Sequence, residues 1–141
     1  PRTAYNVSLA FRSKLRLERA IVQQCFDWIV ERHEVYRTHF VEAQGRVLQV
    51  VEKKPQLVVG EVYIMCAEEA VLVLRKGALL SFDLSKGPLL RVQVLHLTDG
   101  ERISVLGFFT HHIIHDHGCE GTIFGEFMQV YRELTETGTI G

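Results

Sequence analysis

The sequence has no long hydrophobic run and no excess of charge of one sign, and each absence excludes a class of protein. No stretch approaches the roughly 20 consecutive apolar residues of a membrane-spanning helix. The chain has 16 basic and 17 acidic residues, which gives a formal net charge of −1. The composition therefore favours neither a nucleic-acid surface nor a surface for anionic membranes.

Cysteine is scarce as well, since Cys25, Cys66 and Cys119 are odd in number and widely spaced. They match neither a disulfide framework nor a Cys-x-x-Cys metal motif. A lowered thiol pKa at a helix start would make Cys119 a nucleophile, but a small buried thiol is the commoner explanation. We therefore expect a reducing, cytoplasmic compartment.

The apolar pattern predicts a single domain over residues 1–141 with an α+β fold, a mixed and mostly antiparallel sheet with helices packed on it. Alternating or β-branched segments predict strands, over residues 5–14, 35–42, 46–51, 57–64, 89–97 and 102–110. Helical spacing predicts helices, over residues 17–32, 68–80 and 122–134, with a frayed tail at 135–141. The dipeptides Gln44-Gly45 and Asp99-Gly100 predict hairpin turns.

The spacing also predicts which helical residues face the core. In the first helix these are Leu17, Ile21, Cys25, Trp28 and Ile29. In the second helix they are Val71, Leu72, Leu74 and Leu79.

The most unusual stretch is 108–119, where an apolar run ends in four histidines and an aspartate. Residues 103–110 are apolar on both alternating faces, which is typical of a strand in the middle of a sheet. Helical spacing begins at residue 122. The histidines are therefore predicted to lie at a strand-to-helix junction, where rigid elements can present side chains to a cleft.

Adjacent strand residues point to opposite faces, so His111 and His112 are not expected to share one cleft if the strand continues through both. One is then structural, and the other can act as a general base because an imidazole titrates near pH ~6.5. Asp116 is expected either to orient that histidine or to be buried against an arginine. The residues alone leave both roles open.

Two other interpretations of this stretch carry less weight. The stretch contains enough nitrogen, oxygen and sulfur donors for a transition metal. These donors are on His111, His112, His115, Asp116, His117 and Cys119. The spacing matches no common zinc motif, so we assign no metal ligand. The histidines can also be satisfied surface residues at a strand end. For Arg37 and His33, interaction with a helix end is as good an interpretation as a role in the site.

Three segments carry recognisable motifs. His111-His112-Ile113-Ile114-His115-Asp116 matches His-His-x-x-x-Asp-Gly up to its last residue. Residues 32–38 resemble Arg-His-Glu-x-Leu-Arg-Thr, with Tyr36 for Leu, and residues 82–91 resemble Phe-Asp-Leu-x-x-Gly-Pro-Leu-Leu-Arg. In this order the segments resemble the condensation domains of nonribosomal peptide synthetases, including the related domains of polyketide synthases.

The resemblance implies a chloramphenicol-acetyltransferase-like fold, of which this chain is the N-terminal of two lobes. It implies acyl transfer from a carrier-bound donor thioester to a carrier-bound amine or hydroxyl acceptor, in the biosynthesis of antibiotics and other secondary metabolites. Both substrates would be carried on phosphopantetheine arms, and no cofactor would be bound directly. The implied partners are carrier domains and the C-terminal lobe. An isolated lobe would expose an apolar inner face, so self-association is a further expectation.

The resemblance also assigns roles to residues of this chain. His112 would be catalytic, either deprotonating the acceptor amine or stabilising the tetrahedral intermediate. Asp116 would be a structural carboxylate paired with Arg32 or, as second choice, Arg37, because a guanidinium suits a bidentate bond. His111 would support the site.

The chain departs from the family pattern directly after the aspartate. The family has glycine there, whereas this chain has His117, with Gly118 one position later. We assign both residues to substrate binding and expect a shifted loop or an impaired site, because glycine permits backbone conformations that histidine resists. The competing function is therefore a non-catalytic condensation-like module for docking or gatekeeping. Without the C-terminal lobe, the lobe alone is expected to be inactive.

Overall fold

The computed structural model describes residues 6–14, 16–54, 57–100, 102–115 and 120–138. Its four-stranded sheet contains β1 (Asn6–Ser13), β4 (Gly60–Ile64), β5 (Leu90–Leu97) and β6 (Ser104–His111). The long helices are α1 (Arg19–Arg32), α2 (Ala67–Leu79) and α4 (Glu120–Thr137). Shorter elements are the 3-10 helix η2 (Glu34–Arg37), the hairpin strands β2 (Thr38–Ala43) and β3 (Arg46–Val51), and α3 (His112–His115).

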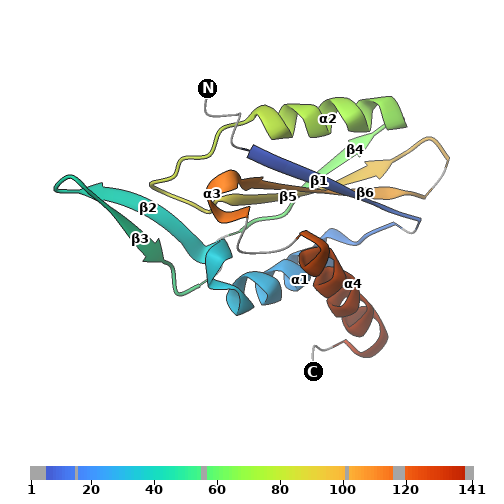
Figure 1. Ribbon diagram of the computed structural model, residues 1–141. Helices are drawn as coiled ribbons and strands as arrows, with labels where there is room; N and C mark the ends of the chain where they lie inside the picture. The colour runs from blue at the N-terminus through green and yellow to red at the C-terminus, as the bar shows by residue number, and fades with distance from the viewer. Residues whose placement is uncertain (1–5, 15, 55–56, 101, 116–119, 139–141) are drawn as a thin grey trace.

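The elements form three layers, with α1 and α4 on one face of the sheet and α2 on the other (Figure 1). The strand order is β1-β6-β5-β4. Only the β4–β5 pair is parallel among the described strands, so the predicted mixed, mostly antiparallel sheet is confirmed. The strand that leads to the histidines, β6, is central, as predicted. No helix in the described ranges is long and apolar enough to cross a membrane.

The face covered by α1 and α4 holds the larger core, which is built from aromatic rings. Phe26 of α1 is fully buried, and its ring centroid lies 6.4 Å from that of Phe108 on β6 and 5.5 Å from that of Phe127 on α4. Three elements that are distant in sequence therefore meet at one side chain. Burying a side chain of this size contributes about 1.5–3 kcal/mol to folding.

The face covered by α2 is packed by close backbone approach instead. A Cβ added to Gly77 of α2 would lie 2.7 Å from the ring of Phe109, and one added to Gly107 of β6 would lie 2.7 Å from Leu74. Side-chain carbons do not approach this closely, so glycine is required at Gly77, where the neighbour is a rigid ring. The helix consequently lies close to the sheet.

Arg91 holds the C-terminal end of α2. Its guanidinium donates hydrogen bonds to the carbonyl oxygens of Gly77, Leu80 and Ser81 at 3.1, 2.6 and 3.2 Å. These carbonyls lie at the negative end of the helix dipole, where a cation is stabilising. The guanidinium carbon also lies 3.9 Å from the ring centroid of Phe82. Phe82 and Arg91, the two ends of one motif, are therefore in contact.

Three predicted boundaries differ from the structure by three residues. Residues 35–37 are not a strand but belong to η2, because the N–H of Tyr36 bonds back to the carbonyl of His33. Residues 57–59 precede β4 and are not a strand. The last helix continues through residues 135–137, which were assigned to the tail. The hydroxyls of Thr135 and Thr137 bond to carbonyls of the preceding turn, and Gly138, with φ +77°, ends the helix.

The predicted core faces of two helices were also partly wrong. Leu17, Cys25 and Ile29 are buried as predicted, and Ile21 and Trp28 are half-buried against the core. The prediction missed three further buried residues of α1, which are Val22, Phe26 and Val30. Of the four residues predicted for the core face of α2, Leu74 is half-buried and packs against the core, and the other three are exposed; these are Val71, Leu72 and Leu79. Both sides of α2 are apolar, so spacing alone did not distinguish the side that meets the sheet.

Candidate functional site

The histidine pair spans the junction between β6 and α3. A strand-to-helix junction was predicted here, but the helix was expected from residue 122 and α3 was not predicted. The strand ends at His111 and the helix begins at His112. The Ile113 backbone N–H donates a hydrogen bond to Nδ1 of His111 at 3.0 Å, as an N-cap side chain receives one from the second residue of a helix. Nδ1 accepts this bond only when it carries no hydrogen, so the neutral ring is protonated at Nε2. His111 therefore caps the short helix that begins with His112.

A second motif supports the capping histidine. The ring centroids of His111 and Phe82 are 6.4 Å apart in an edge-to-face arrangement. Phe82 is itself stacked beneath Arg91. The segment 82–91 thus connects the end of α2 to the histidine junction, and these contacts give a physical reason for the spacing of the motif.

A groove of about 690 Å³ lies beside the junction. One wall is the β2–β3 hairpin and the other is the loop around residues 82–85. Most lining side chains are apolar, with Glu42 and Asp83 also present. His111 and Ile113, the residues on either side of His112 in sequence, complete the lining. The groove can therefore accept an apolar group next to the histidine motif.

Arg37 bonds to backbone carbonyls in the described part of the chain. Its Nε and Nη2 donate to Val30 and Glu31 of α1 at 2.9 and 3.1 Å, and its Nη1 donates to Glu52, just after β3, at 2.6 Å. It therefore joins the C-terminal end of α1 to the end of the hairpin. This is the helix-end interaction that the sequence left open for Arg37.

Arg32 and His33 contact a carboxylate that the sequence did not single out, Glu126 of α4. His33 Nε2 lies 2.7 Å from Glu126 Oε1, and Arg32 Nε lies 3.6 Å from Glu126 Oε2. The guanidinium of Arg32 also lies 5.2 Å from the ring centroid of Trp28. Glu126 directly precedes the buried Phe127. In the sequence, this position beside the apolar face of α4 was the signal that could have identified Glu126.

Several predicted site residues lie outside the described residues. These are Asp116, His117, Gly118 and Cys119, and the side chain of His112 is not described either. The pairing of Asp116 with Arg32 or Arg37 therefore stays a prediction, as does the catalytic orientation of His112. In the described ranges, no three His, Cys, Asp or Glu side chains group closely enough to hold a metal ion.

The described cysteines and a buried hydrogen-bond chain lie apart from the junction. Burial raises the pKa of Cys25 to about 12, so its thiol stays protonated and unreactive at neutral pH.

His96 Nδ1 lies 2.9 Å from Ser104 Oγ, and His96 Nε2 lies 2.7 Å from Glu61 Oε2. Ser104 is fully buried and accepts the Leu17 N–H. This series resembles a nucleophile with its base, but no substrate can reach the serine.

The lobe has the fold of known condensation-type structures. The starter condensation domain of the rhizomide synthetase RzmA superposes with a TM-score of 0.87 at 18% identity, over 99% of this chain and 34% of that chain. The X-domain in its complex with OxyB from teicoplanin biosynthesis gives 0.80 at 23% identity, over 90% of this chain and 27% of that one. These likenesses confirm the predicted class of fold.

The family follows from the sequence comparison. The Condensation domain model matches residues 1–140, so the chain belongs to the condensation-domain family, as the motifs predicted. Tyrocidine synthase 3 of Brevibacillus parabrevis is 34% identical over 130 residues, which are 92% of this chain and 2% of that protein. The chain thus spans a small part of the length of this relative and about a third of the rhizomide domain structure.

Proposed function

We propose that this chain is the N-terminal lobe of a condensation domain that, when complete, transfers the acyl group of a carrier-bound thioester to a carrier-bound amine or hydroxyl. The observation that carries the proposal is the β6–α3 junction. The second histidine of the motif is the first residue of a helix that is capped by the first histidine. A central strand and a cap are rigid supports, which a general base requires.

The reaction balances without an added reagent. The acceptor nitrogen or oxygen attacks the thioester carbonyl carbon, the new C–N or C–O bond forms, and the C–S bond breaks. The phosphopantetheine sulfur of the donor leaves and takes up the proton that the acceptor loses. His112 either removes that proton or donates a hydrogen bond to the oxyanion of the tetrahedral intermediate.

The remaining roles belong to residues around His112. His111 supports the site through its cap. Asp116 is the structural carboxylate. Arg32 is its first partner, because the Arg32 side chain is 61% exposed and its contact with Glu126 is long, with Nε at 3.6 Å. Arg37 is the second choice, since its guanidinium already donates to three carbonyls.

The partners of this function are two carrier domains and the C-terminal lobe. The carriers deliver their substrates on phosphopantetheine arms, so the lobe itself needs no bound cofactor. The apolar groove beside His111 offers a surface for part of a substrate or for the second lobe. The products belong to peptide or mixed peptide–polyketide biosynthesis.

The test is replacement of His112 by alanine in the parent synthetase. We expect product formation to fall by about 100-fold or more, the usual contribution of a general acid–base group. His39→Ala is the matched control, because this histidine lies on β2 and does not line the groove beside the junction. Unchanged product formation by the His112 variant would overturn the catalytic role.

A non-catalytic docking or gatekeeping module is the second candidate. It is favoured by His117 in place of the family glycine, and by the likeness to an X-domain whose structure was solved in complex with another protein. A His117→Gly variant distinguishes the two. The catalytic role predicts faster product formation in this variant, whereas the docking role predicts no change there or in His112→Ala.

A further inference from the structure

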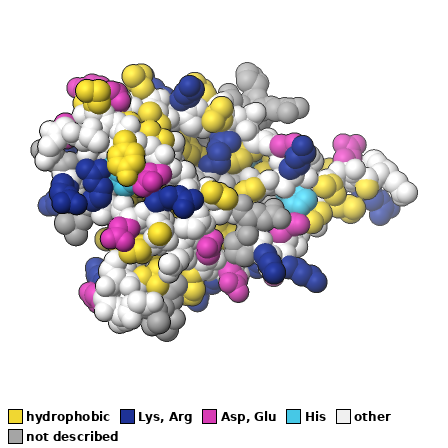
Figure 2. Space-filling view, turned by 180° about the vertical axis from the view of Figure 1, so that it is seen from behind, with side chains coloured by type: hydrophobic (Ala, Val, Ile, Leu, Met, Phe, Trp, Pro, Cys, Tyr) yellow, Lys and Arg dark blue, Asp and Glu magenta, His cyan; other side chains and the backbone are white. Residues whose placement is uncertain are grey.

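The outward side of α2 is unusually apolar. Of the long helices in the described ranges, α2 alone covers its face of the sheet (Figure 1). Val71, Leu72 and Leu79 are 49%, 63% and 66% exposed. The outward side of a surface helix is normally polar, and grouped exposed apolar side chains mark contact sites. Figure 2 shows hydrophobic, acidic and basic side chains interspersed along the upper edge of the molecule, where α2 lies.

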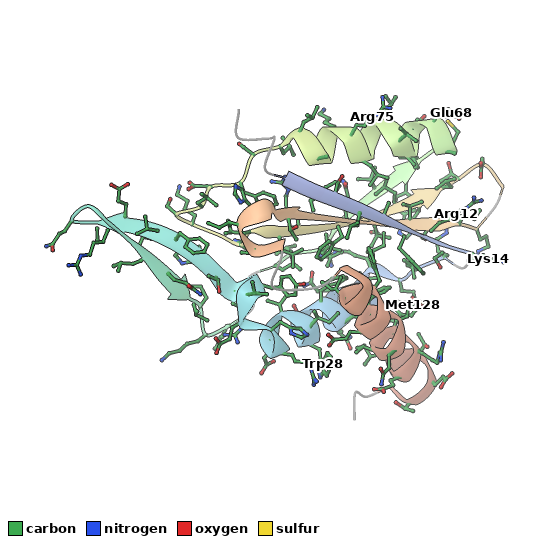
Figure 3. All side chains as sticks on the ribbon, in the orientation of Figure 1. Arg12, Lys14, Trp28, Glu68, Arg75 and Met128 are labelled. Atoms are coloured by element: carbon green, nitrogen blue, oxygen red, sulfur yellow. The ribbon has the colours of Figure 1, made fainter. Side chains whose placement is uncertain are left out.

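Two opposite charges lie on the same outward side. Figure 3 shows Glu68 and Arg75 projecting away from the sheet, near the beginning and beyond the middle of α2. They are seven residues apart, which is close to two helical turns of 3.6 residues. Val71 and Leu72 lie between them. Along its axis the outward side is therefore acidic, then apolar, then basic.

This order is complementary to itself in one orientation only. If a second helix of the same sequence runs antiparallel, Glu68 of each copy meets Arg75 of the other, and the central apolar residues meet at the two-fold axis. A parallel copy would instead place like charges together. From this complementarity we propose that α2 is a contact surface for a second copy of this chain, forming a two-fold symmetric dimer.

The neighbouring residues extend the same surface. Leu79, 66% exposed, lies one turn after Arg75. Glu68, Leu72, Arg75 and Leu79 follow one another at steps of three and four residues, the spacing of the seam between paired helices. Met65, 70% exposed, lies just before the helix and adds an apolar side chain at its N-terminal end.

The size of the helix sets the expected strength. A helix of 13 residues is about 20 Å long, and one such pair buries less than the ~1,200 Å² at the lower end of standard interfaces. We therefore expect a weak dimer, with a dissociation constant of about 10–500 µM. This association does not depend on the proposed acyl transfer.

Sedimentation velocity of the 141-residue chain tests the contact. We expect a reversible shift from monomer to dimer between about 10 µM and about 1 mM, and at least roughly tenfold weaker association for Leu72→Glu. The matched control is Leu48→Glu, which changes a 48% exposed leucine on the β2–β3 hairpin. A monomer throughout this range would overturn the proposal. So would open-ended growth, or loss of the dimer in the Leu48 variant but not the Leu72 variant.

Charge reversal tests the antiparallel orientation. Glu68→Arg and Arg75→Glu should each weaken self-association, because each brings like charges together twice in the symmetric pair. An equimolar mixture of the two variants should associate again, since every cross-contact then joins opposite charges. Circular dichroism verifies that both variants fold. Failure of the folded variants to associate on mixing would overturn the antiparallel pairing.

Discussion

The two faces of the same sheet are packed in opposite ways. On the face of α1 and α4, interlocking rings such as Phe26, Phe108 and Phe127 hold the helices. On the face of α2, Gly77 and Gly107 let the helix approach the strands closely. A thick aromatic layer tolerates little loss of volume, whereas a close backbone contact tolerates little gain. Substitutions at Phe26 on the first face and at Gly77 on the second therefore test the difference.

The largest effect is expected from a loss of volume on the aromatic face. Phe26→Ala removes a fully buried ring that contacts both β6 and α4. We expect the free energy of unfolding to fall by about 3–5 kcal/mol. Urea denaturation measures this change. A fall below about 1 kcal/mol would show that this layer can repack and would remove the contrast between the faces.

A gain of volume should be most costly on the opposite face. Gly77→Ala places a methyl group 2.7 Å from the ring of Phe109. We expect a net destabilisation of about 1–2 kcal/mol, because the overpacking exceeds the gain in helix propensity. The matched control is Gly125→Ala in α4, where nothing lies within 4 Å of the added carbon, and which should stabilise the protein. Equal effects of the two changes would contradict the close approach.

The cap at the junction separates two contributions of one side chain. His111→Phe keeps a ring beside Phe82 but loses the acceptor for the Ile113 N–H, whereas His111→Asn keeps an acceptor. The Phe variant should lose about 1 kcal/mol of local stability, seen as roughly fivefold faster amide hydrogen exchange at Ile113. The Asn variant should retain protection at this amide. Equal exchange in both variants would show that the cap contributes nothing.

The last effect is absent at neutral pH and concerns Cys25, buried on the aromatic face. Burial raises the pKa of its thiol from 9.0 to about 12, so the folded chain keeps a proton that the unfolded chain releases. Its contribution to stability is therefore complete below pH 9.0 and decreases as the pH rises towards 12, by roughly 1 kcal/mol per pH unit. Denaturation at several alkaline pH values should show a shallower decline for Cys25→Ala. Parallel curves would argue against the raised pKa.

The positions of most elements follow from local patterns, but the side of a helix that is buried does not. Alternation and turn residues located β1, the two hairpins and the central strand β6. Leu72 and Leu79 were nevertheless assigned to the core, because a helix with apolar residues on both sides gives no orientation. The missing information is the shape of the sheet beneath, where Gly107 leaves room for Leu74.

In the candidate site, the junction was predictable and the supporting contacts were not. An apolar run followed by His111 and His112 marks the end of a buried strand. The bonds of Arg37 to carbonyls of α1 have no sequence signature, since every residue has a carbonyl. Glu126 was missed because its partner His33 is 93 residues away in the chain.

The pairing of β1 with β6 also has a consequence for the time at which the lobe forms. Ser13 pairs with Ser104 and Asn6 pairs with His111. Strand β1 can therefore pair only after β6, about 100 residues later in the chain, has been synthesised. At a translation rate of about 5–20 residues per second, that wait is roughly 5–20 seconds. Until then, Leu9 and Phe11 have no sheet to join. The strand that completes the lobe is the one that carries the first histidine, so a nascent chain acquires its sheet and its motif together.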